Sequence, residues 1–186
     1  DDEARRDPEA DERRAGRLRE PMVRFIQWGR SFNARSNNGQ WAIGSTANPV
    51  NRLGQSPLRA ASVFNFFRPG YALAAGDAGR AMQGALVAPE FQIANETSVA
   101  GWVNFVQQFA ATGVADVKPD YAAELVLAER PASLVAHLNL LMAAGELSPG
   151  TCALIAQAIQ TLPITTPAGR HNRVAAALTM VMCSPQ

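Results

Sequence analysis

The sequence is poor in the residues from which most metal and catalytic centres are built. Its 186 residues include two histidines and two cysteines, each pair far apart along the chain. Residues so few and so widely spaced argue against a metal centre or a thioredoxin-like redox pair. The motifs G-x-S-x-G, H-E-x-x-H, the phosphate-binding loop and the dinucleotide fingerprint are also missing. We therefore expect no metal and no cofactor, and the sequence indicates no catalytic residue.

The sequence also lacks a long apolar run and a strong net positive charge, which argues against a membrane span and a nucleic-acid partner. No apolar run reaches the roughly 18–20 residues that a membrane span requires, so no membrane span is expected. The net charge is +1, whereas a nucleic-acid binder needs a concentrated basic surface, so no nucleic acid is expected either. The chain opens on a charged run rather than a signal peptide. A cytoplasmic protein, a processed exported protein and a piece of a longer chain all remain open.

Charge is concentrated at the start of the chain. Residues 1–20 hold eight of the 16 carboxylates together with six arginines. Residues 1–19 have almost no apolar side chain with which to join a core. We interpret 1–19 as a charged arm or linker and 20–186 as a helical domain, with the 47% hydrophobic content of a globular protein.

Helical periodicity and helix-boundary residues dominate the domain. Pro21 suits a first helical turn, Asn95 is a good N-cap, and Ser148-Pro149 and Thr166-Pro167 are cap and first-turn pairs. The predicted helices run from Pro21 to about Asn37, from Asn95 to Gly113, and over 120–127, 131–144, 150–162 and 167–183, with a short one near 78–85. Strand patterns are nearly absent. The prediction is an all-α, irregular helical bundle with long aromatic-rich loops and helical hairpins in the C-terminal third.

The segment 36–58 is predicted to be a long loop, because Asn, Gly, Ser and Pro cluster there and no periodicity survives. Trp41 is the one aromatic residue of this loop, and we expect it to anchor the loop to the core. Connections of this length inside a domain tend to be functional or disordered.

The stretch from Gln55 to Phe109 is the centre of the chain, because it holds most of the phenylalanines with polar residues set among them. Its turn signal is Arg68-Pro69-Gly70-Tyr71. The candidate ligand-binding residues are Arg59, Asn65, Arg68, Glu90, Asn95 and Glu96. A charge among aromatics is costly unless it is paired. Two interpretations stay open, namely a buried arginine–glutamate pair that holds the loops on the helices, and a polar pocket for a carbohydrate or an acidic ligand.

The remaining polar features are more simply explained by structure than by chemistry. His137 is a lone histidine on a predicted helix, and His171 lies in the polar start of the last one. We interpret both as structural. Asn95-Glu96-Thr97 matches the glycosylation acceptor pattern, but a helix cap explains the asparagine.

Several phrases are more specific than any generic motif. They are LREPMVRF (18–25), GQSPLRAASVFNFFRPGY (54–71), LVAPEFQIANETSVAGWVNF (86–105), NLLMAAGELSP (139–149) and RVAAALTMVMCSP (173–185). In this order they resemble the C-terminal third of the bacterial domain of unknown function 1800 family. The resemblance implies a long, mostly helical protein, of which the N-terminal two thirds would be missing here. It also implies export to the periplasm or the medium, and a partner that is a secreted, sulfatase-like protein of the domain of unknown function 1501 family.

Two functions follow as hypotheses. In the first, the chain is a structural or interaction module whose loop 36–58 docks the N-terminal part of the same polypeptide or another protein. In the second, it is part of a hydrolase of an extracellular polymer, with Arg59, Arg68 and Glu96 as binding groups. A bare apolar patch would favour the module, and a concave pocket with converging polar groups would favour the enzyme.

A disulfide between Cys152 and Cys183 is also predicted. Cys152 lies near the start of one helix and Cys183 at the end of the next, ends that face each other in an antiparallel hairpin. The export that the resemblance implies would permit oxidation. The alternative is two independent buried thiols.

Overall fold

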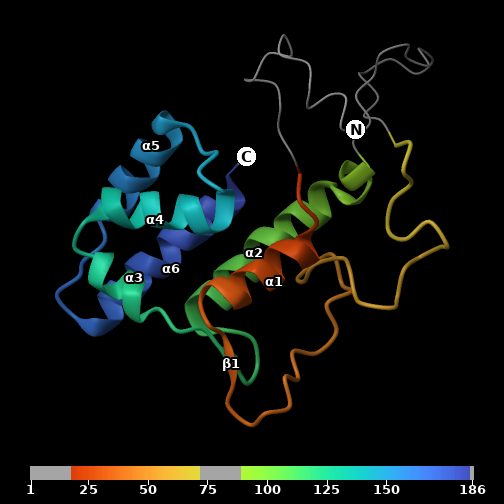
Figure 1. Ribbon diagram of the computed structural model, residues 1–186, viewed down its shortest axis with the longest axis horizontal. Coiled ribbons are helices and arrows are strands. Elements are labelled where there is room, and N and C mark those ends of the chain that lie inside the picture. Colours follow the sequence, from red (N-terminus) through yellow and green to blue (C-terminus); the bar gives the residue numbers. More distant parts are fainter. Residues whose placement is uncertain (1–17, 72–88, 185–186) are drawn as a thin grey trace.

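The all-α prediction is confirmed by the computed structural model, which describes residues 18–71 and 89–184 (Figure 1). Within these ranges the elements are α1 (Pro21–Ser31), β1 (Arg35–Ser36), the 3-10 helix η2 (Pro89–Ile93), α2 (Glu96–Thr112), β2 (Val117–Lys118), α3 (Ala122–Leu127), α4 (Pro131–Ala143), α5 (Pro149–Gln160) and α6 (Pro167–Cys183). The short helix predicted near 78–85 and most of the arm predicted over 1–19 lie outside the described residues.

The helix ends lie close to where the capping residues predict them. Asn95 Oδ1 accepts the Ser98 N–H at 2.9 Å, and Ser98 Oγ accepts the Asn95 N–H at 2.9 Å, which completes a capping box before α2. Ser148 and Thr166 cap α5 and α6 in the same way. The first helix is the exception, because α1 ends at Ser31, earlier than predicted.

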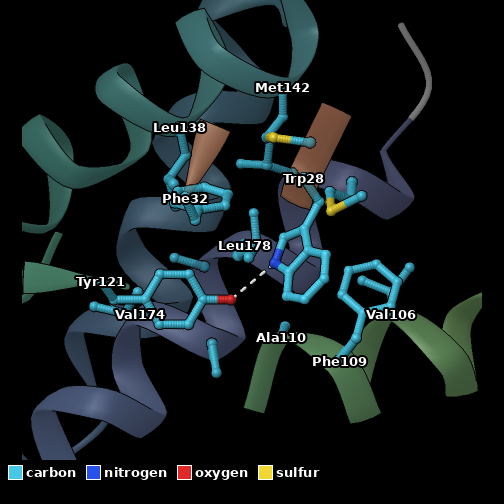
Figure 2. Close-up of a cluster of buried hydrophobic side chains, with 14 of the residues drawn as sticks. Trp28, Phe32, Val106, Phe109, Ala110, Tyr121, Leu138, Met142, Val174 and Leu178 are labelled. Carbon is cyan, nitrogen blue, oxygen red and sulfur yellow. Dashed lines mark hydrogen bonds between the residues drawn. The ribbon is translucent and has the colours of Figure 1, made fainter. Parts of the chain in front are cut away.

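The core is formed where α1 and α2 meet the bundle of α3 to α6. The rings of Trp28 and Phe109 lie 4.6 Å apart, and those of Phe25 and Phe105 lie 5.4 Å apart, which joins α1 to α2. Leu138 on α4 and Leu178 on α6 close the other side of this cluster (Figure 2). The longest helices, α2 and α6, pack directly on each other.

A minimal sheet joins two distant parts of the chain. β1 pairs antiparallel with β2, so that Arg35 faces Lys118 and Ser36 faces Val117. The close approach needs a glycine at the end of α2, since a Cβ at Gly113, whose φ is +74°, would lie 2.2 Å from the Val117 carbonyl oxygen. The sheet thereby fixes where the long connection after α1 begins.

That long connection has two halves with different burial. Residues 45–56 return to the helices: Leu53 and Gln55 are buried, and Gly101 of α2 lies directly against the Pro49 backbone. Residues 57–65 are all exposed. In Figure 1 this second half runs along the edge of the molecule opposite α3 and α5. The prediction that Trp41 anchors the loop is wrong, because its side chain is 56% exposed and Gln55 and Leu53 are the anchors instead.

Candidate functional site

The most unusual surface lies on residues 56–71, here called the turn segment. It contains three consecutive β-turns, closed by hydrogen bonds from the Arg59 N–H to the Ser56 carbonyl (3.2 Å), from Asn65 to Ser62 (3.1 Å) and from Tyr71 to Arg68 (3.0 Å). The turns begin six residues apart, at 56, 62 and 68. The turn predicted at Arg68-Pro69-Gly70-Tyr71 is thus confirmed, and it is the last of the series.

The tips of the first two turns are apolar. Turn tips normally carry Gly, Pro, Asn, Asp or Ser, for conformational reasons. Here Leu58 is 105% exposed, Val63 is 96% exposed and Phe64 is 55% exposed. Leu58 also has a φ of +58°, a left-handed conformation that non-glycine residues seldom adopt. Exposed apolar tips in a strained backbone are typical of a recognition surface rather than of an ordinary loop.

The turn segment is fixed to the fold at both ends. At its start, Gln55 is fully buried; its Oε1 accepts the Met22 N–H at 3.1 Å and its Nε2 donates to Glu20 Oε2 at 2.8 Å. Near its end, the Arg68 N–H donates to Gln92 Oε1 of η2 at 2.7 Å. The tips are therefore presented by a segment held at the N-terminus of α1 on one side and by η2 on the other.

The charged side chains of residues 21–71 are all positive. Residues 21–71 contain six arginines and no Asp or Glu. Arg59 and Arg68, both exposed, belong to the turn segment. Over residues 18–71 and 89–184 the ion pairs are His137–Glu124 and Arg170–Glu129, so neither arginine is paired within that part of the chain.

The six predicted site residues fall into two groups. Arg59, Asn65 and Arg68 lie together in the turn segment, and Glu90, Asn95 and Glu96 lie in η2 and at the start of α2. The predicted buried pair between Arg68 and Glu90 or Glu96 is not formed among the described residues, because Arg68 is exposed to solvent and belongs to neither of the ion pairs found there. Asn95 is engaged as the cap of α2. That these residues bind a ligand stays a prediction.

Sequence reasoning missed the apolar tips themselves. Leu58 was placed in the predicted loop 36–58, and no exposure was predicted for Val63 and Phe64, since their stretch is rich in phenylalanine. The signals that point to a surface are Pro57 and Ser62, which favour turns on either side of Arg59. The absence of acids from 21–71 was a second signal.

Both histidines lie in structural contacts away from the turn segment. Glu124 of α3 is buried, and its Oε1 lies 2.9 Å from Nε2 of His137 on α4. The ring of His171 lies 5.7 Å from that of Tyr121 and makes an aromatic contact. These contacts agree with the structural interpretation of both histidines.

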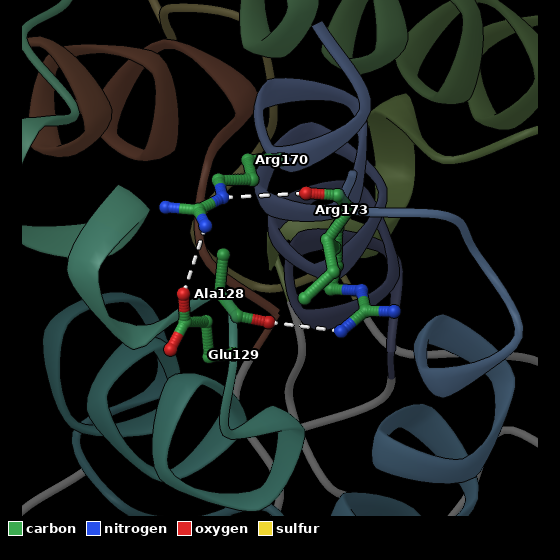
Figure 3. Close-up of polar contacts among 5 residues, drawn as sticks. Ala128, Glu129, Arg170 and Arg173 are labelled. Atoms are coloured by element: carbon green, nitrogen blue, oxygen red, sulfur yellow. Dashed lines mark hydrogen bonds and ion pairs between the residues drawn. The ribbon is translucent and has the colours of Figure 1, made fainter. Parts of the chain in front are cut away.

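Two arginines of α6 join it to its neighbours (Figure 3). Arg170 donates to Glu129 at 2.8 Å on the surface. Arg173 is buried and donates to the carbonyls of Ala128 (2.9 Å), Gln160 (3.0 Å) and Leu162, which belong to the ends of α3 and α5. Arg173 therefore neutralises the partial negative charge at two helix C-termini.

A third arginine, Arg24, contacts the C-terminal end of α6. Arg24 of α1 donates to the Met182 carbonyl, and its guanidinium carbon lies 4.7 Å from the ring centre of Trp102. Trp102 Nε1 donates to the same carbonyl at 3.4 Å. Burial lowers the pKa of Arg24 to about 10, which leaves the guanidinium charged at neutral pH.

Among the described residues, one pocket lies away from these groups and brings few polar side chains together. An open pocket of about 380 Å³ lies between α3 and the start of α6, lined by Leu125, Thr165, Thr166, Pro167 and Arg170. Its one charged side chain, Arg170, is already engaged by Glu129. Across the described residues no three His, Cys, Asp or Glu side chains are grouped so as to hold a metal ion, and no helix is long and apolar enough to cross a membrane.

The predicted disulfide is not formed. Both cysteines are free and half-buried. Cys152 Sγ lies 3.6 Å from Asn139 Nδ2 and 3.8 Å from the Leu147 carbonyl, at the turn between α4 and α5. Cys183 lies near Arg24 of α1, and burial raises the pKa of its thiol. The two thiols thus have different neighbours. An antiparallel arrangement of α5 and α6 brings the helix ends near each other but does not make the two side chains face each other.

Comparison with known proteins gives one match. The family model described as "Protein of unknown function (DUF1800)" matches residues 3–186. No curated protein and no solved structure matches the chain.

Proposed function

This chain belongs to the family of proteins of unknown function named DUF1800, and we propose that it acts there as an interaction module that docks a partner protein through its turn segment. The observation that carries the proposal is the row of exposed apolar tips at Leu58, Val63 and Phe64. Apolar side chains gathered on one surface element gain free energy when a partner covers them, at about 25 cal/mol per Å². Hydrogen bonds hold the segment at both ends, which reduces the conformational freedom lost on binding.

The resemblance of the sequence phrases supplies the setting of this proposal. It implies a bacterial protein exported to the periplasm or the medium. The partner would then be the secreted, sulfatase-like protein or the N-terminal region of a longer form of the same polypeptide. In both cases the turn segment, rather than the first half of the long connection, is the docking element, because residues 45–56 are already bound to α1 and α2.

The hydrolase alternative has less support. Its expected signature is a concave pocket on which several polar groups converge. In the part of the chain that the structure describes, the buried Glu124 contacts His137 of α4, and the buried Arg173 donates to the Ala128 carbonyl at the end of α3, so both residues serve contacts between helices. Arg59 and Arg68 are exposed, and neither lines the pocket between α3 and α6.

The experiment compares two triple variants of the whole protein. One is Leu58→Ser/Val63→Ser/Phe64→Ser in the turn segment. The matched control is Val126→Ser/Leu140→Ser/Leu154→Ser, whose side chains are 71%, 66% and 68% exposed on α3, α4 and α5. Each is titrated with the sulfatase-like partner by calorimetry. We expect wild type and control to bind alike and the turn variant to bind at least tenfold more weakly. Equal binding by the turn variant would refute the proposal.

A further inference from the structure

The turn segment also constrains the chemistry of its partner, an inference that rests on the proposed function. We infer that the partner protein presents an acidic face, in which Asp and Glu carboxylates surround an apolar pocket. Phe64 would enter that pocket, and Arg59 and Arg68 would meet the carboxylates.

The arginines of residues 21–71 divide by what they contact. Arg24 and Arg52 lie over aromatic rings, at 4.7 Å from the Trp102 centroid and 4.8 Å from the Phe105 centroid. Arg59 and Arg68 are exposed and beside the apolar tips, since Arg59 follows Leu58 directly and Arg68 opens the third turn. These two are therefore the cations that a docked surface would meet.

Residues 21–71 contain no carboxylate, so the charged side chains of the turn segment itself, Arg59 and Arg68, are both positive. A partner surface of matching negative charge is attracted, and a basic one is repelled, so the arginines select the partner as well as speeding its approach. Guanidinium groups form two parallel hydrogen bonds with a carboxylate, which fixes orientation. Phenylalanine and arginine together are typical of the energetic centre of a protein interface.

A lipid bilayer fits these observations less well. Clusters that bind anionic lipid carry about four to eight basic residues, and the turn segment has Arg59 and Arg68. Its three apolar tips amount to about one acyl chain of hydrocarbon, which alone gives marginal membrane binding. A protein pocket, by contrast, gains from a rigid and specific arrangement of side chains, which the two anchored ends provide.

The test places a photoreactive benzophenone amino acid at Val63 of the whole protein, in cells that produce it naturally, with Leu154 as the control position. Adducts are identified by mass spectrometry. We expect Val63, and not Leu154, to cross-link to a protein peptide with several Asp or Glu residues. Adding Arg59→Gln/Arg68→Gln should lower the yield at Val63 at least fivefold. The control is Arg30→Gln/Arg35→Gln, since these arginines are also exposed and also lie within residues 21–71. This control should leave the cross-linking yield at Val63 unchanged.

The other outcomes separate the inference from the proposed function. A protein adduct with a neutral or basic peptide, or a yield that Arg59→Gln/Arg68→Gln does not change, overturns the acidic partner and leaves the docking module standing. A peptide from a second copy of this chain overturns the inference in the same way. Lipid adducts, or a yield at Val63 no higher than at Leu154, overturn the proposed function and the inference together.

Discussion

Trp28 and Tyr121 are joined inside the core by a hydrogen bond of 2.9 Å, in which Trp28 Nε1 donates to Tyr121 Oη (Figure 2). The bond connects α1 to the residue that precedes α3, 93 positions along the chain. Both residues are almost fully buried. It therefore fixes the position of α1, and with it the Gln55 anchor of the turn segment at the start of that helix.

Replacing Tyr121 by phenylalanine should destabilise the fold while preserving its packing. The indole N–H of Trp28 would be left buried without an acceptor, which costs about 1–3 kcal/mol in the free energy of unfolding. Tyr71→Phe is the control, because Tyr71 is only half-buried, and we expect a change of less than about 0.5 kcal/mol. Urea unfolding measures both. Equal stability of Tyr121→Phe and wild type would show that the bond contributes nothing net.

The same residue predicts a loss of stability in alkali. Burial is the main cause that raises the pKa of Tyr121 above its ordinary value of 10.0. Above that pH the unfolded chain releases the phenolic proton while the folded chain retains it, so folding becomes less favourable as pH rises. We expect the unfolding free energy of wild type to fall more steeply above pH 10 than that of Tyr121→Phe. Parallel pH profiles of the two proteins would contradict this.

The parts of the fold that the sequence predicts are local. Asn95, Ser148 and Thr166 mark helix starts because each cap depends on the next few residues only. The exact buried face is less well specified. Helical spacing puts Ile26 on the same face as Phe25 and Val99 on the same face as Trp102, yet they are 51% and 54% exposed, because periodicity indicates a face but not its edges.

The candidate site shows where local reasoning ends. Turn-forming residues do place Arg59, Asn65 and Arg68 in one segment. Whether that segment is covered depends on contacts with residues distant in sequence, such as the bond from Gln55 to Glu20, and no local pattern encodes these. An aromatic-rich composition is compatible with a core and with an interface alike, since both are stabilised by apolar burial.

Arg173→Met should be among the most destabilising substitutions. It removes the donor shared by the carbonyls of Ala128, Gln160 and Leu162, where α3 and α5 end against α6. Leaving a buried carbonyl without its donor costs about 1–3 kcal/mol in the free energy of unfolding, and three carbonyls lose theirs here. Asn172→Ala, at the exposed neighbouring position, is the control and should stay near wild type. Thermal melting compares them, and similar melting temperatures would show that water replaces the guanidinium at no cost.

Gly101→Ala should loosen the anchored half of the long connection. A Cβ at this position would lie 2.0 Å from the Pro49 carbonyl oxygen, so residues 49–50 must move away from α2. Overpacking of this kind costs about 1–3 kcal/mol, which outweighs the gain of up to about 1 kcal/mol from replacing a helical glycine. Gly150→Ala is the matched control, because a Cβ at Gly150 would lie 3.8 Å from its nearest neighbour, Ser148 Oγ, and so fits without any shift. Limited proteolysis should cut residues 45–56 faster in Gly101→Ala, and equal rates in the two variants would contradict this.

The cysteines give the most direct test of the helix arrangement. Cys152 Sγ faces Asn139 and the Leu147 carbonyl, whereas Cys183 ends α6 beside Arg24. We therefore expect two free thiols per chain when the protein is denatured without reductant and titrated with a thiol reagent. In the native protein at pH 8, Cys183 should react more slowly than in the denatured chain, because burial raises its pKa and lowers the fraction of reactive thiolate. If denatured, unreduced protein shows no free thiol, the two cysteines form a disulfide, and the start of α5 and the end of α6 must lie closer together than in this structure.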